Sequence, residues 1–277
     1  MRYLAGISKA ALWLALVAPL PAAAQGDPLQ RLDPARFGAG EIIAALEELD
    51  DYLPGQAYDP TMALLGHPEP EVNRAAGWLL RRMGRADNGA NRVAEILAAA
   101  DATPEQRWAA VCAIGPLRSG TGTARAALAD DPDPLVRAAA ARALGEVQRS
   151  GSTSALIAAL ADEDAGVRLA AGRALGLQPD CSADMLIAAT SHEDAGVRLQ
   201  VVWALAQERF EGASGLAGHL RRIMQMDTDC RVQAAAAWAL GEIGDPTARD
   251  ALTQAVDSSP CRLCSQAAAA ALVKMGD

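Results

Sequence analysis

The chain has 277 residues and a formal net charge of −9 at pH 7; 51% of its residues are hydrophobic but only 4% are aromatic. An acidic surface repels the phosphates of nucleic acids and anionic lipids, so we expect neither as a partner. Most of the apolar excess is alanine, which favours helices and lets them pack closely.

The first residues are typical of an export signal. Arg2 and Lys9 flank a short basic start, an apolar stretch of residues 10–20 comes next, and the small residues Ala22 and Ala24 follow it. We predict cleavage after Ala24, which removes two positive charges and takes the net charge from −9 to −11. The stretch is too short for a membrane span of about 20 residues. We therefore predict a periplasmic protein without membrane insertion.

One segment recurs seven times along the rest of the chain. Residues 131–145 read DPDPLVRAAAARALG, and residues 162–176 read DEDAGVRLAAGRALG. Other copies begin at His67, Asp101, His192, Asp227 and Ser259, so that consecutive copies start 30 to 35 residues apart. A period of this length predicts a stack of structural repeats.

Each copy reads as the start of a helix followed by the helix itself. The acidic residues at its front can cap backbone N–H groups, and Pro134 sits where a first-turn proline is tolerated. Val136 and Leu144 fall on one helical face. We predict that Gly145 and Gly176 end their helices, and that Pro116 ends the helix of the second copy.

A less regular helix precedes each copy. The expected ranges are 40–53, 60–65, 91–100, 121–129, 154–161, 183–190, 215–226 and 246–256. One helix pair cannot bury both of its apolar faces, so neighbouring pairs must stack. The sequence therefore predicts an all-α fold, an α-solenoid of stacked antiparallel helix hairpins. We divide it into a signal peptide (1–24), an N-terminal segment with a capping helix (25–59) and the repeat array (60–277).

The pattern Asp-x-Asp-x-x-Val-Arg-x-x-Ala-x-x-Ala-Leu-Gly resembles the HEAT-like repeats first associated with phycobilisome lyases, an armadillo-like architecture. The resemblance covers about residues 60–277. It implies that the arginine after the valine pairs with acidic turn residues along the stack, as a structural ladder. The arginines at this place are Arg107, Arg137, Arg168 and Arg198. Asn73, Gln233 and Ser265 replace the arginine in other copies, so we expect a weaker ladder at both ends.

A helical wheel of one repeat predicts a partner-binding surface. With Val136 inward, Ala138, Ala141 and Arg142 point away, toward the concave side that second helices of HEAT-like stacks usually line. In the other repeats, this outward side carries the four tryptophans of the mature chain. The candidate partner-binding residues are Trp78, Trp108, Arg142, Arg173, Trp203 and Trp238. Such a composition is typical of a binding hot spot; alternatively, the rings fill the seams between alanine-rich repeats.

Five cysteines occur: Cys112, Cys181, Cys230, Cys261 and Cys264. An oxidising compartment permits disulfides. Cys230 and Cys261 begin the helices of adjacent repeats and are candidates for pairing, and Cys261 with Cys264 is the local alternative. We expect Cys112 to be a reduced residue within a helix.

No cofactor or metal site is expected. Cys261-Arg-Leu-Cys264 lacks the histidine needed for haem attachment and further ligands for zinc. His192-Glu193 resembles one His-Glu pair of the HEAT-repeat di-iron hydroxylases, but a helix-start role is favoured because those enzymes need several pairs. The Asp-x-Asp turns lack the oxygen ligands of a calcium loop.

No phosphate loop, nucleophile elbow or metalloprotease motif is present. We therefore predict a protein-binding scaffold or assembly factor in the periplasm, with another protein or peptide as its partner and no enzymatic activity. The alternative, which the family resemblance suggests, is a bilin-lyase-like or other tetrapyrrole-handling protein.

Overall fold

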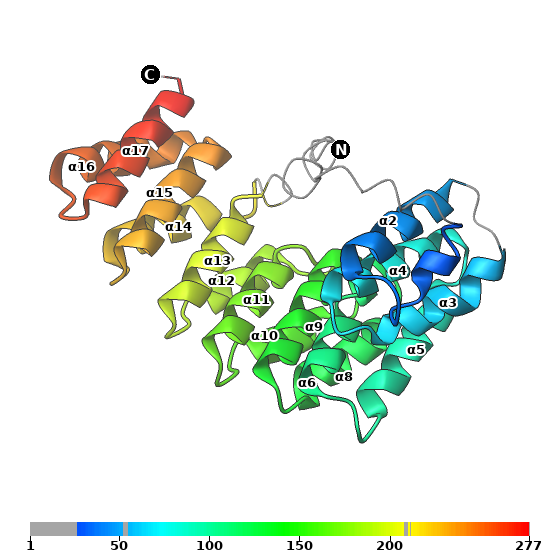
Figure 1. Cartoon of the computed structure of the whole chain (residues 1–277). Helices are drawn as coiled ribbons and strands as arrows, with labels where there is room; N and C mark the ends of the chain where they lie inside the picture. The colour runs from blue at the N-terminus through cyan, green and yellow to red at the C-terminus, as the bar shows by residue number, and fades with distance from the viewer. Residues whose placement is uncertain (1–26, 52–54, 208–209, 211, 277) are drawn as a thin grey trace.

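The computed structural model describes residues 27–51, 55–207, 210 and 212–276. The predicted signal peptide, residues 1–24, lies outside them. The described chain is helical and contains no strand, and its helix pairs follow one another in a curved stack (Figure 1). The prediction of an α-solenoid is confirmed. None of the described helices is long and apolar enough to cross a membrane.

The repeated segment forms the second helix of each pair. These helices are α4 (Pro70–Arg82), α6 (Pro104–Val111), α9 (Pro134–Val147), α11 (Ala165–Leu175), α13 (Ala195–Leu205), α15 (Cys230–Ile243) and α17 (Arg262–Lys274). Their starts follow from the acidic turns, because Asp133, Asp164, Asp194 and Asp229 each accept a backbone N–H of the first turn. These side chains satisfy donors that a helix start leaves unpaired.

The first helices of the pairs lie close to the expected ranges. They are α3 (Tyr58–Ala63), α5 (Ala86–Ala98), α8 (Thr121–Asp130), α10 (Thr153–Ala159), α12 (Ala183–Ala189), α14 (Leu216–Met226) and α16 (Arg249–Ser258). Before them stand the short 3-10 helix η2 (Gln30–Leu32) and α2 (Ala39–Asp50), with η3 (Gly55–Ala57), η4 (Leu64–Gly66) and η6 (Pro246–Ala248) as short additions. Helix α5 begins five residues before its predicted start.

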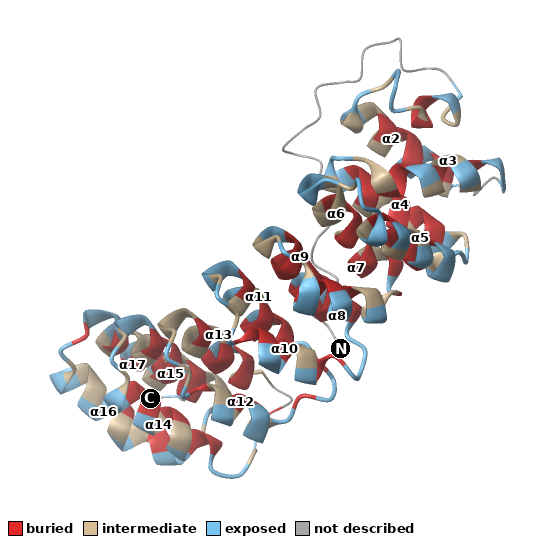
Figure 2. Cartoon of the chain, turned by 90° about the horizontal axis from the view of Figure 1, so that it is seen from below, coloured by how far each residue is buried: buried red, intermediate tan, exposed pale blue. Residues whose placement is uncertain are grey.

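The two kinds of helix form two rows. Figure 2 shows α9, α11 and α13 in one row and α8, α10 and α12 in the other. Neighbouring second helices pack more closely on one another than neighbouring first helices do. The closely packed row must lie on the inside of a curve, so the second helices line the concave side of the stack.

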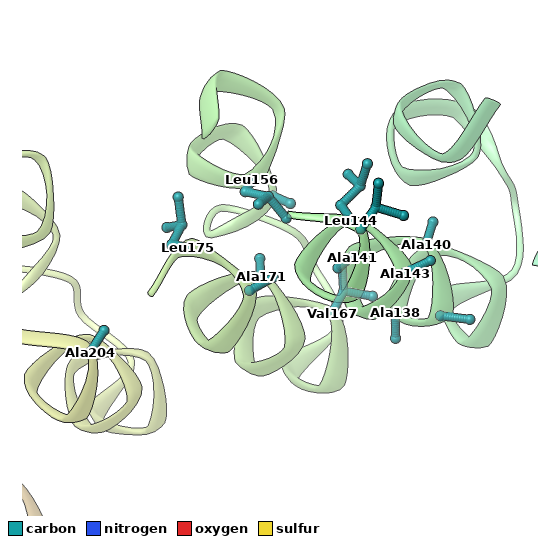
Figure 3. Close-up of a cluster of buried hydrophobic side chains, with 14 of the residues drawn as sticks. Ala138, Ala140, Ala141, Ala143, Leu144, Leu156, Val167, Ala171, Leu175 and Ala204 are labelled. Carbon is teal, nitrogen blue, oxygen red and sulfur yellow. The ribbon is translucent and has the colours of Figure 1, made fainter. Parts of the chain in front are cut away.

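The core is built from alanine and leucine. Val136, Val167 and Val197 are fully buried on three second helices that lie side by side, and Figure 3 shows the small side chains around α9 and α11 that let these helices approach. The prediction that Ala138 and Ala141 point outward is wrong, because Ala141 is 0% and Ala138 only 9% exposed. Both belong to the buried core cluster.

The glycine of the repeated segment allows neighbouring second helices to pack closely and does not by itself end the helix. Gly145 lies inside α9, which continues to Val147 and is closed by Gln148 in a left-handed conformation. A Cβ at Gly145 would lie 3.1 Å from the Cβ of Ala174 on α11. Gly176 does follow the last residue of α11, but in right-handed helical backbone. The prediction that Gly145 ends its helix is therefore wrong.

Pro116 breaks its helix earlier than predicted. Helix α6 ends at Val111, and a separate turn, α7 (Ile114–Leu117), contains the proline. Proline lacks a backbone N–H and its ring clashes with the carbonyl four residues earlier, here that of Cys112. The break therefore falls at Cys112, which caps the end of α6 rather than lying within it.

Candidate partner-binding surface

The six candidate residues lie on successive second helices and all reach the surface. Trp203 is 51% exposed, and Arg142 and Arg173 are also exposed. Trp78, Trp108 and Trp238 are half-buried and pack against the core. The spacing of about one repeat places one such residue on each of the second helices α4, α6, α9, α11, α13 and α15.

The structure stacks two of the four tryptophans. The rings of Trp203 on α13 and Trp238 on α15 lie with centroids 4.8 Å apart and planes 29° from parallel. They line a shallow hollow of about 320 Å³, and the other lining residues are Leu199, Arg231, Ala234, Ala235 and Leu263. Because stacked rings present a rigid apolar face, this hollow can hold an apolar side chain with little loss of conformational freedom.

A second hollow continues the first along the stack. It has a volume of about 480 Å³ and is lined by Arg173, Leu177, Gln200, Trp203, Ala204 and Gln207. Trp203 belongs to both hollows, so they form one surface that runs from α11 to α17. We call the two together the Trp203–Trp238 surface.

Two arginines border this surface. Arg231 pairs with Asp229 at 2.8 Å, and this carboxylate raises the pKa of Arg231. Arg173 makes no hydrogen bond or ion pair with the residues that the structure describes. Among those residues, Arg173 is thus a cation beside an apolar surface without a carboxylate partner.

Trp108 and Arg142 lie in a different hollow, between α4, α6 and α9. This hollow of about 330 Å³ is also lined by Arg74, Cys112 and Glu146. Arg74 pairs with Glu146 at 3.3 Å, and burial raises the pKa of the Cys112 thiol. Its lining is therefore more polar than the Trp203–Trp238 surface.

Trp78 lines none of these three hollows. The guanidinium carbon of Arg82 lies 5.8 Å from the centre of its ring, as in a cation–π contact. The six candidate residues therefore do not form one continuous ridge. The structure joins Arg173, Trp203 and Trp238, places Trp108 with Arg142, and leaves Trp78 apart.

Sequence reasoning missed the aliphatic part of the surface. Leu177, Leu199 and Leu263 line it, and Leu263 is 53% exposed. Leu199 stands at the repeat position of Trp108, and Leu263 at that of the exposed Leu135. A comparison of every repeat position, instead of only the tryptophan positions, would have found both.

The repeat arginines join neighbouring turns. Arg107 donates to Asp131 at 2.9 and 3.1 Å, Arg137 to Asp162 at 2.8 and 2.9 Å, and Arg198 to Asp227 at 2.8 and 2.8 Å. Arg168 donates to Asp194 at 2.9 and 2.5 Å. Each of the four also donates to one or two carbonyls of its own turn. These arginines thus connect repeats and line neither hollow of the Trp203–Trp238 surface.

The replacements at the ends keep only the local part of this contact. Asn73 donates to the carbonyls of His67 and Glu69, and Gln233 donates to that of Asp227 at 2.6 Å. Ser265 donates to the carbonyl of Val256. None of these shorter side chains is hydrogen-bonded to the turn of the next repeat within the described residues.

The side chain of His192 stabilises the turn before α13. Its Nδ1 accepts the N–H of Asp194 at 3.0 Å, which is the bond that Asp131 makes with Asp133. Among the described residues, no group of three or more His, Cys, Asp and Glu side chains could hold a metal ion. The local bond accounts for the histidine at this helix start.

Three cysteines gather at the last two repeats. Cys230 is exposed, Cys261 and Cys264 are buried, and all three are thiols in this structure. The Sγ of Cys261 lies 3.5 Å from the carbonyl oxygen of Cys230 and accepts the N–H of Cys264 at 3.2 Å. The cluster lies at the starts of α15 and α17, and none of its three cysteines lines either hollow of the Trp203–Trp238 surface.

Comparisons with known proteins identify the repeats. A family model of HEAT repeats matches residues 123–180, 153–215 and 218–277. A search of curated protein sequences found no match.

Several solved structures are similar in fold. The YibA protein of Escherichia coli shares 16% identity at a TM-score of 0.53, and the match covers 90% of each chain. The complex of CpcE and CpcF of phycocyanin lyase from Nostoc shares 17% identity over 79% of this chain and 88% of that one, at a TM-score of 0.42. Human deoxyhypusine hydroxylase shares 19% identity over 90% of this chain and 94% of that one, at a TM-score of 0.38. Identities this low show the fold alone.

Proposed function

The chain belongs to the HEAT-repeat family, and we propose that it is an exported scaffold whose Trp203–Trp238 surface binds a segment of another protein. The stacked pair Trp203 and Trp238 carries this proposal. Large apolar side chains that lie exposed together on a soluble protein often mark an interaction site. Tryptophan and arginine are among the residues enriched in binding hot spots.

The chemistry of the surface selects the kind of segment. The hollow between Trp203, Trp238 and Leu263 fits a large apolar side chain. Arg173, which pairs with no carboxylate among the described residues, complements an acidic group farther along the same segment. We therefore propose a polypeptide that carries an apolar anchor and a carboxylate, laid across α11, α13, α15 and α17.

The N-terminal sequence supports a location outside the cytoplasm. The basic start, the apolar stretch of residues 10–20 and the small residues at Ala22 and Ala24 match an export signal. An exported scaffold would meet its partner in the periplasm. The competing proposal, tetrapyrrole binding, has only the family resemblance in its support.

Site-specific crosslinking in the native cells tests the binding proposal. A photo-crosslinking residue in place of Leu263 should capture one periplasmic protein, and the crosslink should fall within one segment of that protein. The scaffold chain in the crosslinked product should begin at Gln25 if the export signal is cleaved as proposed. The matched control is Ile157 on the first-helix row, which is 40% exposed and apolar and should capture nothing specific. Equal capture at both positions would contradict the proposal.

Truncation of the stacked rings tests the same surface in vitro with the captured partner. The double substitution Trp203→Ala and Trp238→Ala should weaken binding at least about 30-fold, since loss of one hot-spot residue costs about 2 kcal/mol or more. Ile157→Ala should leave the affinity unchanged, and circular dichroism should show both variants folded. An unchanged affinity in the double variant refutes the proposal. An absorbance shift of added bilin that the double variant abolishes would favour tetrapyrrole binding instead.

A further inference from the structure

The turns of the last two repeats lack the arginine–aspartate pair that joins the turns before them, although Lys274 pairs with Glu242 at the other end of the same helices. From Arg107 to Asp227, each second helix is connected to the next turn by an arginine and an aspartate. At the α15–α17 boundary, Gln233 stands in place of the arginine and Ser259 in place of the aspartate. Ser259 instead accepts the N–H of Cys261 at 3.2 Å, a bond within its own turn.

Two cysteines face each other at this same boundary. Cys230 is the first residue of α15, and Cys261 caps the start of α17, the place that Asp229 holds in the preceding repeat. The Cys261 Sγ donates to the Cys230 carbonyl oxygen at 3.5 Å, and the neighbouring Cys261 thiol raises the pKa of the Cys230 thiol. The chain therefore brings two sulfurs together where the other repeats bring together a guanidinium and a carboxylate.

We propose that Cys230 and Cys261 form a disulfide that joins the last two repeats in place of the missing ion pair. The exposed Cys230 thiol loses its proton and attacks an external disulfide, such as glutathione disulfide or a disulfide oxidoreductase. One thiol leaves, and Cys230 remains as a mixed disulfide. The Cys261 thiolate then attacks the Cys230 sulfur and releases the second thiol. The external disulfide is reduced to two thiols, and the cysteine pair is oxidised with loss of two protons.

Cys264 is the competing partner, and its position disfavours it. Its side chain is 1% exposed and buried in the first turn of α17. Burial thus hides its sulfur from an external disulfide, whereas the Cys230 thiol is exposed. Its backbone N–H, rather than its sulfur, is hydrogen-bonded to Cys261.

Peptide mapping of the full mature chain distinguishes the three pairings. Trypsin cuts after Arg222, Arg231, Arg249, Arg262 and Lys274, so that Cys230, Cys261 and Cys264 fall on three different peptides, residues 223–231, 250–262 and 263–274. The hydrogen bond to Cys261 raises the pKa of Cys230 to about 11. The chain is therefore treated with glutathione disulfide at about pH 8.5, where thiolate is more abundant, then alkylated and digested without reductant.

The expected product is the peptide 223–231 linked to 250–262. It should persist in Cys264→Ser and disappear in Cys230→Ser and in Cys261→Ser, with circular dichroism as the check that each variant folds. Linkage of 250–262 to 263–274, of 223–231 to 263–274, or recovery of all three peptides unlinked would overturn the proposal. Cys112→Ser, far from the boundary, is the control that should change nothing.

Discussion

One carboxylate can accept two sets of hydrogen bonds, as it does at Asp131, Asp162 and Asp227. Each accepts the backbone N–H two residues later, which fixes the turn. Each also accepts two N–H groups from the arginine of the preceding repeat, the fork geometry in which guanidinium–carboxylate pairs are strongest. His192 stands at the same place but makes only the turn bond. Arg168 therefore reaches Asp194, where Nε and Nη2 share one oxygen.

The substitution His192→Asp should stabilise the protein. An aspartate can keep the turn bond and also give Arg168 two carboxylate oxygens, which leaves Asp194 to cap α13. We expect a gain of about 0.5–1 kcal/mol in the free energy of unfolding, the upper range for a partly exposed ion pair. Urea denaturation followed by circular dichroism measures it.

His67→Asp is the matched control for this prediction. His67 makes the same turn bond, to the N–H of Glu69 at 3.0 Å, but no repeat arginine precedes it in the described residues. It should give no comparable gain. Equal gains for the two substitutions would mean that the turn, and not the arginine, benefits.

The sequence identified the four arginines but could not identify every acceptor. The arginines recur at a fixed place after the valine, so alignment of the repeats is enough to find them. The turn before α13 offers His192, Glu193 and Asp194 as candidate partners for Arg168. Only the three-dimensional structure shows that Arg168 selects Asp194.

At the scale of the helix, the second row is limited by how closely backbones can approach. A Cβ at Gly241 on α15 would lie 2.6 Å from the Cβ of Ala271 on α17, closer than two carbons pack. By contrast, nothing lies within 4 Å of a Cβ at Gly122 on the exposed side of α8. The two glycines therefore respond oppositely to the same added methyl group.

Gly241→Ala should destabilise the protein, and Gly122→Ala should stabilise it. Overpacking costs about 1–3 kcal/mol, whereas alanine in an open helical position gains about 0.5–1 kcal/mol over glycine. Thermal melting of both variants beside the parent chain gives the comparison. A Gly241→Ala variant as stable as the parent would show that α15 and α17 separate at no cost.

A helical wheel failed for the second helices because it assumes one buried face. Ten of the 14 residues of α9 are buried, since the helix contacts the second helices on both sides as well as its own partner. Only a narrow strip containing Arg142 stays exposed. The sequence therefore gave the residue at the centre of that strip but misplaced Ala138 and Ala141 at its edges.

At the scale of the whole molecule, the charged turns make stability depend on pH. Hydrogen bonds from Arg168 lower the pKa of Asp194. Burial opposes ionisation of Asp162, but the bonds from Arg137 and the Asp164 N–H outweigh it and lower its pKa as well. The bonds from Arg231 lower the pKa of Asp229 to about 2. A carboxyl group with a lowered pKa binds its proton more weakly in the folded chain than in the unfolded chain.

The protein should therefore lose stability in acid. The contribution of these groups is fully present above their unfolded pKa of about 4 and is lost as the pH falls through their lower folded pKa values. The melting temperature should change little from about pH 7 to 5 and fall steeply below about pH 4. In Asp194→Asn, the melting temperature should start lower at neutral pH and fall less in acid. An identical fall in both proteins would exclude Asp194 as a source.

The contact between α15 and α17 also sets the width of the binding surface. Trp238 on α15 and Leu263 on α17 line the same hollow from opposite sides of that boundary. The distance between the two helices is set by the close approach of Gly241 to Ala271, and Lys274 pairs with Glu242 at 2.5 Å across the same boundary. A methyl group added at Gly241 should therefore also change the hollow proposed to hold the partner's apolar side chain.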